Sequence, residues 1–231
     1  METNTVTKTT REAQYSTCIE LRDTVGIQPL GIVMNLVWEE NPRHMLFMLA
    51  RYKFVARMLE GRENVLEIGC GDAFASRIVK QTVGNLTAVD FDPVFIEDAK
   101  ARASETWPID VRVHDILDGP VEGHFDAAYS IDVIEHIEPR DEETYLNNIL
   151  ANLDKDGVLI IGTPTLESQI HASPRSVEGH VNCMSAPDLK ARMEKYFKTV
   201  IIFSMNDEVI HTGFHKMAHY LFAVCSHRRT G

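Results

Sequence analysis

The stretch NVLEIGCGDAFASRIV, residues 64–79, decides the fold of this chain. Its apolar start, glycine-rich middle and helix-forming end predict a β-strand, a turn and an α-helix in succession. Because Gly69 and Gly71 carry no side chain, a ligand can approach the backbone of the turn closely. We therefore expect the turn to bind the nucleotide portion of a cofactor at the end of a buried strand.

The residues around the turn narrow the choice of cofactor. A dinucleotide-binding turn has a third small residue where Phe74 stands, and no Gly-Lys-Ser/Thr sequence of a phosphate-binding loop follows. The carboxylates of Glu67 and Asp72 flank the turn and would repel a pyrophosphate. They favour a positively charged ligand without phosphate, and S-adenosylmethionine, with a sulfonium and an amino group, fits this description. The alternative is a turn that only starts a helix and binds no ligand.

Two acidic residues stand at the ends of the next predicted strands. Asp90 ends the second strand, where a carboxylate can accept hydrogen bonds from both ribose hydroxyls. The alternative role of Asp90 is to cap the following helix, which Asp92 can do better. Asp115 ends the third strand and can accept a hydrogen bond from an adenine amino group, with Ile116 against the ring. A plain turn aspartate is the alternative for Asp115.

Strand and helix patterns alternate over the middle of the chain. This rhythm predicts an α/β fold with a doubly wound parallel sheet, whose short apolar strands are covered on both faces. The predicted strands are residues 64–69, 85–91, 110–115, 125–131 and 157–164, and the predicted helices between them are residues 74–82, 94–105 and 141–152.

The flanking segments have different patterns. Residues 41–61, NPRHMLFMLARYKFVARMLEG, have apolar residues at helical spacing and predict an amphipathic helix, with basic side chains such as Arg51 toward solvent or a ligand. Residues 165–184 show no periodicity and predict an irregular loop that closes over the site. Residues 185–197 predict a further helix, and the two apolar runs after it predict an antiparallel hairpin.

Composition and charge limit the partners of the protein. Hydrophobic residues make up 44% of the chain, and the formal net charge of −11 argues against general affinity for nucleic acids or anionic membranes. The four cysteines are too widely spaced for a zinc-cysteine or disulfide pattern. The polar start lacks the apolar core of a signal peptide, and no apolar run reaches the roughly 18 residues of a spanning helix. We expect a cytoplasmic protein with no nucleic-acid partner and no stable membrane insertion; a homodimer stays open.

Five motifs occur in the order VLEIGCGDA, AVDFDP, VHDIL, FDAAYSIDVIEHI and GVLIIGTP. Together they resemble the motifs of class I S-adenosylmethionine-dependent methyltransferases. The resemblance implies a Rossmann-like, seven-stranded, mostly parallel sheet with an antiparallel last strand and an N-terminal helical extension. We therefore predict a partly disordered extension over residues 1–40 and a methyltransferase domain over residues 41–231.

The resemblance also implies a cofactor site. The implied contacts are with the methionine portion, the ribose, the adenine and the pocket wall, and they involve Gly69, Gly71, Asp90, Asp115, Ile116 and Ile131. Glu67 and Phe91 complete the predicted cofactor-binding set. The sequence IDVIEHI resembles ubiquinone-pathway O-methyltransferases, in which an arginine after Asn-Pro touches the cofactor carboxylate. Arg43 has a similar place in NPR, and a solvated charge at the start of a helix is its alternative role.

The resemblance implies methyl transfer to a small molecule, with S-adenosyl-L-homocysteine as the product. We expect the acceptor to be a hydroxyl of a saccharide, a lipid-linked compound or a secondary-metabolite intermediate. The alternative enzymes are an N-methyltransferase and a protein or RNA methyltransferase. A scaffold that binds the cofactor without catalysis is the alternative outside enzymes.

A hydroxyl acceptor calls for a base, and histidine is the side chain most easily poised for that role near neutral pH. His180, in EGHVNC, and His136, after the fourth strand, are the predicted catalytic residues, with loop or capping histidines as the alternative. Asp132, Glu135 and His136 also have the residue types of a divalent-ion site. Many methyltransferases carry similar residues without a metal, so we predict no metal.

Overall fold

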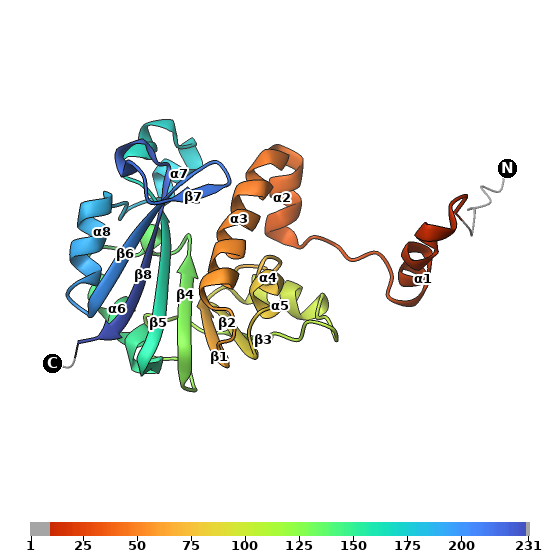
Figure 1. Ribbon diagram of the computed structural model, residues 1–231, viewed down its shortest axis with the longest axis horizontal. Coiled ribbons are helices and arrows are strands. Elements are labelled where there is room, and N and C mark those ends of the chain that lie inside the picture. Colours follow the sequence, from red (N-terminus) through yellow and green to blue (C-terminus); the bar gives the residue numbers. More distant parts are fainter. Residues whose placement is uncertain (1–9, 230–231) are drawn as a thin grey trace. The chain divides into compact units, whose positions relative to one another are not determined.

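A sheet of eight strands runs through the unit Gly31–Gly231 in the order β3-β2-β1-β4-β5-β8-β6-β7 (Figure 1). The first five strands in this order are mutually parallel, and β8 is antiparallel to both of its neighbours. The strands are β1 (Asn64–Ile68), β2 (Asn85–Asp90), β3 (Asp110–Val113), β4 (Phe125–Ile131), β5 (Leu153–Pro164), β6 (Phe197–Asn206), β7 (Val209–His211) and β8 (Tyr220–Arg228).

The prediction of a mostly parallel sheet with an antiparallel last strand is confirmed, but the predicted number of seven strands is wrong. The additional strand is β7, which pairs with the end of β6 through a tight turn at Asp207. A strand of three residues is too short to show an alternation of apolar and polar residues, so the sequence pattern could not reveal it.

Helices cover both faces of the sheet. Apolar side chains of α3 and α4 form one core with β1, β4 and β8, while α6 and α8 form another core against the opposite face. The helices of this unit are α2 (Ile32–Glu40), α3 (Pro42–Met58), α4 (Ser76–Lys80), α5 (Pro93–Ala101), α6 (Glu142–Asn152), α7 (Pro174–Gly179) and α8 (Ala186–Met193). Three short 3-10 helices of this unit are η2 (Ile134–His136), η3 (Glu167–His171) and η4 (His215–Met217).

The structure describes residues 10–229, and the unit Met1–Leu30 contains η1 (Ala13–Tyr15) and α1 (Ser16–Thr24). No residue of these two helices is buried. Of residues 1–40, for which we predict a partly disordered extension, residues 1–9 lie outside the described residues. Within the described part, no helix combines the length and apolar character needed to cross a membrane.

The segment predicted to be an irregular loop, residues 165–184, contains η3 and α7 instead. Pro174 occupies the first turn of α7, and the Ser173 side chain accepts a hydrogen bond from the backbone N–H of Ser176. This start is a regular helix cap. Both helices are so short that helical periodicity could not appear in the sequence.

Helix α2 is fastened to the glycine turn by Asp72. Gly31 stands at the N-cap position and has no side chain, and Asp72 Oδ2 accepts hydrogen bonds from Val33 N–H at 2.8 Å and Met34 N–H at 3.2 Å. Asp72, although distant in the sequence, thus caps the N-terminus of α2 in place of an N-cap side chain. A Cβ atom on Gly31 would lie 2.6 Å from Asp72 Oδ2, so this contact requires glycine. Asp72 therefore holds α2, rather than a positively charged ligand, next to the turn.

We predict that Asp72→Ala releases α2 while the sheet stays folded. The backbone N–H groups of Val33 and Met34 lose their acceptor, so the free energy of unfolding should fall by about 1–2 kcal/mol. Hydrogen–deuterium exchange should speed up over residues 32–40. Asp92→Ala is the matched control, because Asp92 caps α5 through Val94 N–H and should leave exchange in α2 unchanged. Equal exchange of α2 in wild type and Asp72→Ala would contradict the prediction.

Candidate functional site

Two pockets lie at the carboxyl edge of the parallel strands. The first, here the glycine pocket, has a volume of about 710 Å³ and lies where the sheet order reverses between β1 and β4. Ligands of open α/β sheets bind at this position, and the volume suits a cofactor. The glycine pocket is lined by Val33, Ile68, Gly69, Gly71, Asp90, Phe91, Phe95, His114, Asp115, Ile116, Leu117, Asp132, Val133, His136 and Ile137.

The second pocket, here the histidine pocket, has a volume of about 490 Å³. It shares Val33, Asp132 and His136 with the glycine pocket, so the two cavities adjoin. The histidine pocket is lined by Val33, Val37, His44, Met48, Arg51, Asp132, Glu135, His136, Pro164, Ser168, Gln169, His171, Ala172, Ser176, His180 and His219.

Six of the predicted cofactor residues meet in the glycine pocket. The members of this set come from three strand ends and the turns behind them, namely Gly69, Gly71, Asp90, Phe91, Asp115 and Ile116. Gly71 has a positive φ of 52°, and a Cβ atom there would meet nothing nearer than Val33 Cγ2 at 3.9 Å. The backbone of the turn is therefore open to a ligand, as the glycine pattern predicts.

Backbone amides hold the two aspartates of the pocket in place. Asp90 Oδ2 accepts a hydrogen bond from Gly71 N–H at 2.8 Å, and Oδ1 accepts one from Asp92 N–H at 2.9 Å. Asp115 Oδ1 accepts one from Leu117 N–H at 2.9 Å. Each carboxylate keeps further lone pairs for a ligand because an ionised carboxylate can accept about four hydrogen bonds. The Asp92 side chain caps α5, as expected.

Glu67 and Ile131 do not line either pocket. Side chains alternate between the faces of a strand, and both residues point toward the α3 side of the sheet. Glu67 is buried, its Oε1 accepts a hydrogen bond from the Tyr52 hydroxyl at 2.8 Å, and burial raises the pKa of its carboxyl. The two residues support the strands behind the pocket wall, and the geometry offers neither of them a direct ligand contact.

Arg43 lines neither pocket and is an exposed residue in the first turn of α3. Arg51, two turns further along α3, is buried and lines the histidine pocket. Its Nη1 forms an ion pair with Asp132 Oδ2 at 2.6 Å, and its guanidinium lies 3.9 Å from the centre of the Tyr220 ring. A signal for this burial exists in the sequence, because Val55 and Phe47, four residues to either side of Arg51, are apolar.

Asp132 stands at the border of the two pockets in an unusual backbone conformation. Its φ is +58°, a left-handed value that is uncommon for residues other than glycine. The backbone N–H of Asp132 donates to the carbonyl of Gly162 at 3.0 Å, which fixes this conformation at the end of β4. The turn brings the carboxylate to Arg51, and such strain is concentrated at functional sites.

His136 and His180, the two predicted catalytic residues, lie side by side. Their ring centres are 5.1 Å apart. His136 Nδ1 lies 2.9 Å from the carbonyl oxygen of Gly179, and His180 Nδ1 lies 2.9 Å from Gln169 Oε1. Both partners are oxygen acceptors, so Nδ1–H donates in both contacts, and Nε2 is the nitrogen of each ring that faces away from them. Burial and the neighbouring His136 lower the pKa of His180, which favours the neutral ring.

Backbone hydrogen bonds bring His180 to this position. The carbonyl oxygen of Glu135 accepts from Val181 N–H at 2.8 Å and from Asn182 N–H at 3.0 Å. The Asn182 side chain donates to Glu142 Oε2 at 2.8 Å, which ties the same segment to α6. The end of α7 is thereby docked onto η2, although the two are far apart in the sequence.

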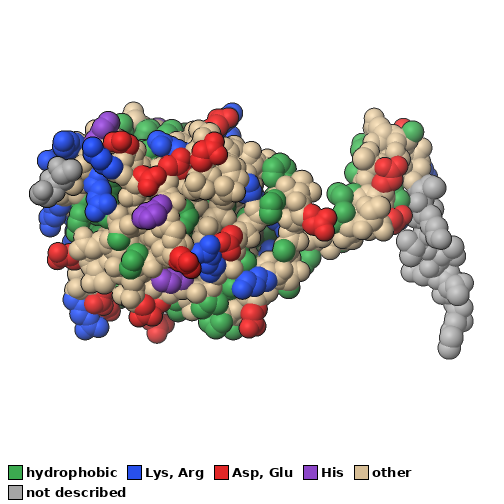
Figure 2. All heavy atoms as spheres, turned by 90° about the horizontal axis from the view of Figure 1, so that it is seen from below, with side chains coloured by type: hydrophobic (Ala, Val, Ile, Leu, Met, Phe, Trp, Pro, Cys, Tyr) green, Lys and Arg blue, Asp and Glu red, His purple; other side chains and the backbone are tan. Residues whose placement is uncertain are grey.

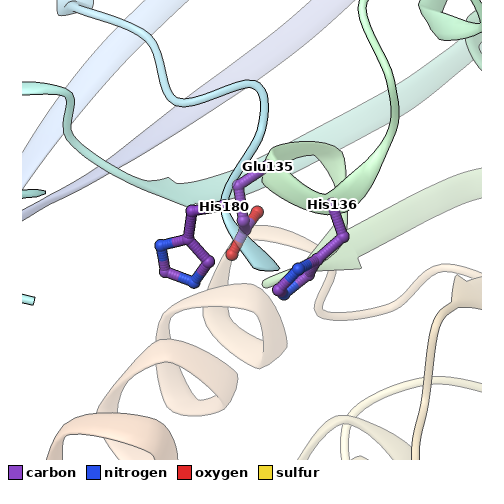
Figure 3. A group of neighbouring side chains, drawn as sticks. All are labelled: Glu135, His136 and His180. Atoms are coloured by element: carbon purple, nitrogen blue, oxygen red, sulfur yellow. The ribbon is translucent and has the colours of Figure 1, made fainter. Parts of the chain in front are cut away.

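The Glu135 side chain completes this cluster. It is 1% exposed, and its Oε2 accepts a hydrogen bond from the Thr163 hydroxyl at 3.1 Å. Burial, and then the nearby carboxylate of Asp132, raise the pKa of Glu135. One ligand atom each from Glu135, His136 and His180 lie within 4.8 Å of one another (Figure 3). The arrangement can thus take up a proton or hold a cation.

Comparison with known proteins points to a single family. The family model described as a methyltransferase domain matches residues 65–157. The mitochondrial ubiquinone biosynthesis O-methyltransferase of Schizosaccharomyces pombe is 33% identical over 107 residues, which are 44% of this chain and 38% of that protein. The ubiquinone biosynthesis O-methyltransferase of Xanthomonas axonopodis pv. citri is 27% identical over 138 residues, 57% of this chain and 56% of that protein. The chain thus matches roughly half or less of the length of these relatives.

Solved structures share the fold. The N-methyltransferase NodS from Bradyrhizobium japonicum WM9, in complex with S-adenosyl-L-homocysteine, superposes with a TM-score of 0.61 and 21% sequence identity, over 84% of this chain and 91% of that one. Motif order, the pocket at the reversal of strand order and the matched domain agree with one another. By its matched domain, its curated relatives and its fold, the chain is similar to the class I S-adenosylmethionine-dependent methyltransferases.

Proposed function

We propose that this protein transfers a methyl group from S-adenosylmethionine in the glycine pocket to a hydroxyl of a small molecule in the histidine pocket. The observation that carries the proposal is that the two pockets adjoin at Asp132 and His136. Methyl transfer is an in-line displacement, so donor and acceptor must meet at one point in a fixed orientation. The border between the pockets supplies such a point.

The glycine pocket supports the cofactor half of the proposal. The methionine portion lies against Gly69 and Gly71, Asp90 accepts from the ribose hydroxyls, and Asp115 accepts from the adenine amino group. Ile116 and Phe91 contact the adenosine as apolar neighbours. The placement of all six predicted residues around one cavity of suitable volume supports these proposed roles.

The methionine end of the cofactor reaches the border of the two pockets. There the carboxylate of Asp132 can accept from the α-amino group, and Arg51 can pair with the cofactor carboxylate. We therefore transfer the role predicted for Arg43 to Arg51, whose guanidinium lies at the border while Arg43 is exposed outside both pockets. Glu67 contributes by supporting β1 and Tyr52 behind the turn.

The histidine pocket supports a polar acceptor of small size. Its walls carry imidazoles, the Gln169 amide and the Ser168 and Ser176 hydroxyls, which suit the hydroxyl groups of a saccharide or a similarly oxygenated compound. In the reaction the acceptor oxygen bonds to the methyl carbon, the carbon–sulfur bond breaks, and S-adenosyl-L-homocysteine leaves. The hydroxyl proton must be removed, and His180 and His136 lie at the right place to assist.

The alternatives are less well supported. An RNA acceptor is disfavoured by the net charge of −11, and Figure 2 shows acidic and basic side chains interspersed on the face it draws. A protein acceptor would have to enter a cavity of about 490 Å³ with a single side chain. A small-molecule amine stays the alternative acceptor, because neutral imidazoles can also receive its proton. A scaffold without catalysis would not need the histidine cluster.

We predict that the protein binds S-adenosylmethionine and S-adenosyl-L-homocysteine, and that Asp90→Asn weakens both at least tenfold, by about 1.4 kcal/mol or more. The amide loses the charge that strengthens hydrogen bonds from the ribose. Isothermal titration calorimetry measures the affinities. Asp118→Asn is the matched control, an exposed aspartate outside both pockets that should bind like wild type. Absence of binding to the wild type would refute the cofactor proposal, and equal affinity of Asp90→Asn would remove Asp90 from the ribose.

We predict that His180→Ala lowers the rate of methyl transfer by about 100-fold while the affinity for S-adenosylmethionine changes less than threefold. His180 lies on the acceptor side of the border, so its loss should affect transfer and not cofactor binding. Tritium transfer from labelled cofactor to a panel of sugar nucleotides and phenols measures the rate. His124→Ala, at an exposed histidine outside both pockets, should transfer like wild type. An unchanged rate for His180→Ala would exclude His180 from catalysis.

A further inference from the structure

We propose that a cavity between α4, α5 and β3, here the arginine cavity, binds a phosphate group, as free phosphate or on a small molecule. The arginine cavity has a volume of about 250 Å³, and Figure 1 shows α4 and α5 next to each other. None of the described residues lines both this cavity and one of the other two pockets, so the site does not depend on the proposed methyl transfer. The side chains of its wall that can donate hydrogen bonds are Arg77, Lys100, Arg102, Ser104 and Trp107.

Arg77 is a cation of the cavity wall, and none of the ion pairs formed within residues 10–229 includes it. Its Nη2 donates to the neutral backbone carbonyl of Arg102. Burial, and then the neighbouring positive charge of Arg102, lower the pKa of Arg77. Because an arginine side chain stays charged in proteins, the two like charges remain side by side. An anion bound between them would relieve this repulsion.

Arg102 is a second cation of the wall. It is 6% exposed, and its Nε and Nη2 donate to Asp98 Oδ2 at 3.0 Å and 2.7 Å. Nη2 also donates to the backbone carbonyl of Asp72. Nη1 takes part in none of the side-chain hydrogen bonds between described residues, so its two N–H groups remain for a ligand. A guanidinium that other contacts hold in place is preorganised for an oxyanion, and arginine is the side chain that suits phosphate best.

The carboxylates of the wall already have partners. Asp72 accepts hydrogen bonds from backbone N–H groups of α2 and from Phe74 N–H, and Asp110 forms an ion pair with Arg112. The positive charges of the wall therefore stay available to a ligand. The remaining wall is partly apolar, and the ring of Trp107 is 38% exposed. This surface can contact the organic part of a phosphorylated small molecule.

Arg102 connects the arginine cavity to α2. The Asp72 carbonyl that accepts from Arg102 belongs to the residue whose carboxylate caps α2. Asp98 Oδ2, the ion-pair partner of Arg102, lies 3.4 Å from Ile32 N–H in the first turn of α2. Val33 of α2 lines both the glycine pocket and the histidine pocket. A phosphate group that holds Arg102 in place should therefore stabilise α2 beside these two pockets.

The test is isothermal titration calorimetry of the full-length protein with inorganic phosphate and with phenyl phosphate, at constant ionic strength in chloride. We expect about one equivalent of each to bind, and phenyl phosphate to bind more tightly because its ring contacts Trp107. Arg77→Gln should weaken the binding of both at least tenfold. Arg77→Lys keeps the charge without the planar fork and should weaken binding less. Trp107→Ala should weaken the binding of phenyl phosphate alone.

Arg57→Gln is the matched control, because Arg57 is an exposed arginine of α3 outside the cavity, and this variant should bind like wild type. Equal affinities for the two phosphates would support the site and identify free phosphate as its ligand. The site would be refuted by no saturable binding to wild type, or by equal binding to wild type and Arg77→Gln. Competition between phosphate and S-adenosyl-L-homocysteine would place the phosphate in the glycine pocket and overturn the proposal as well.

Hydrogen–deuterium exchange over residues 32–40 tests the connection to α2. Saturating phenyl phosphate should slow this exchange in the wild type, because the ligand holds Arg102 beside Asp72. At the same ligand concentration Arg77→Gln should show little slowing. Exchange that stays the same at saturation in the wild type would refute the connection between the cavity and α2. Since neither measurement requires methyl transfer, failure of the transferase proposal would leave both results interpretable.

Discussion

The ion pair between Arg51 and Asp132 connects the two halves of the site. Arg51 comes from α3, which covers one face of the sheet, and Asp132 comes from the end of β4, the strand at which the sheet order reverses. The pair fixes α3 over the carboxyl edge and places one carboxylate in the walls of both pockets. Without this pair the buried guanidinium of Arg51 would have no counterion. The strained left-handed conformation of Asp132 would then have no ion pair to compensate for it.

Much of the fold follows from local pattern. The strands of the parallel part are short apolar runs between turn residues, and the order of strands and helices specifies a doubly wound sheet. The glycine pocket could be predicted for a related reason, because the carboxyl ends of parallel strands meet at one edge. Asp90 and Asp115 therefore had to approach the turn at Gly71. The short elements β7, with three residues, and α7, with six, were not predicted because each contains fewer than two full periods of its pattern.

Other parts of the site depend on contacts between distant segments. The role of Asp72 depends on its contact with α2, which is distant in the sequence. The local sequence around the glycine turn is the same whether the carboxylate faces a ligand or the start of a helix. Glu67 is a different case. The alternation of side chains along β1 places it on the same face as Val65, so a strict period-of-two reading would have directed it into the core. The contact between the Glu135 backbone and the segment after α7 cannot be predicted from any local sequence pattern.

The extent of the family match differs between the two pockets. The matched domain, residues 65–157, contains the glycine turn, both pocket aspartates and Glu135, but it excludes Arg51 and His180. The cofactor half of the site is thus the shared part, whereas the histidine pocket is built largely from α3 and residues 164–180. In the proposed reaction the acceptor would therefore be bound largely by segments outside the matched domain. The segment after α7 is hydrogen-bonded to the backbone carbonyl of Glu135, and this contact sets the distance between the rings of His136 and His180.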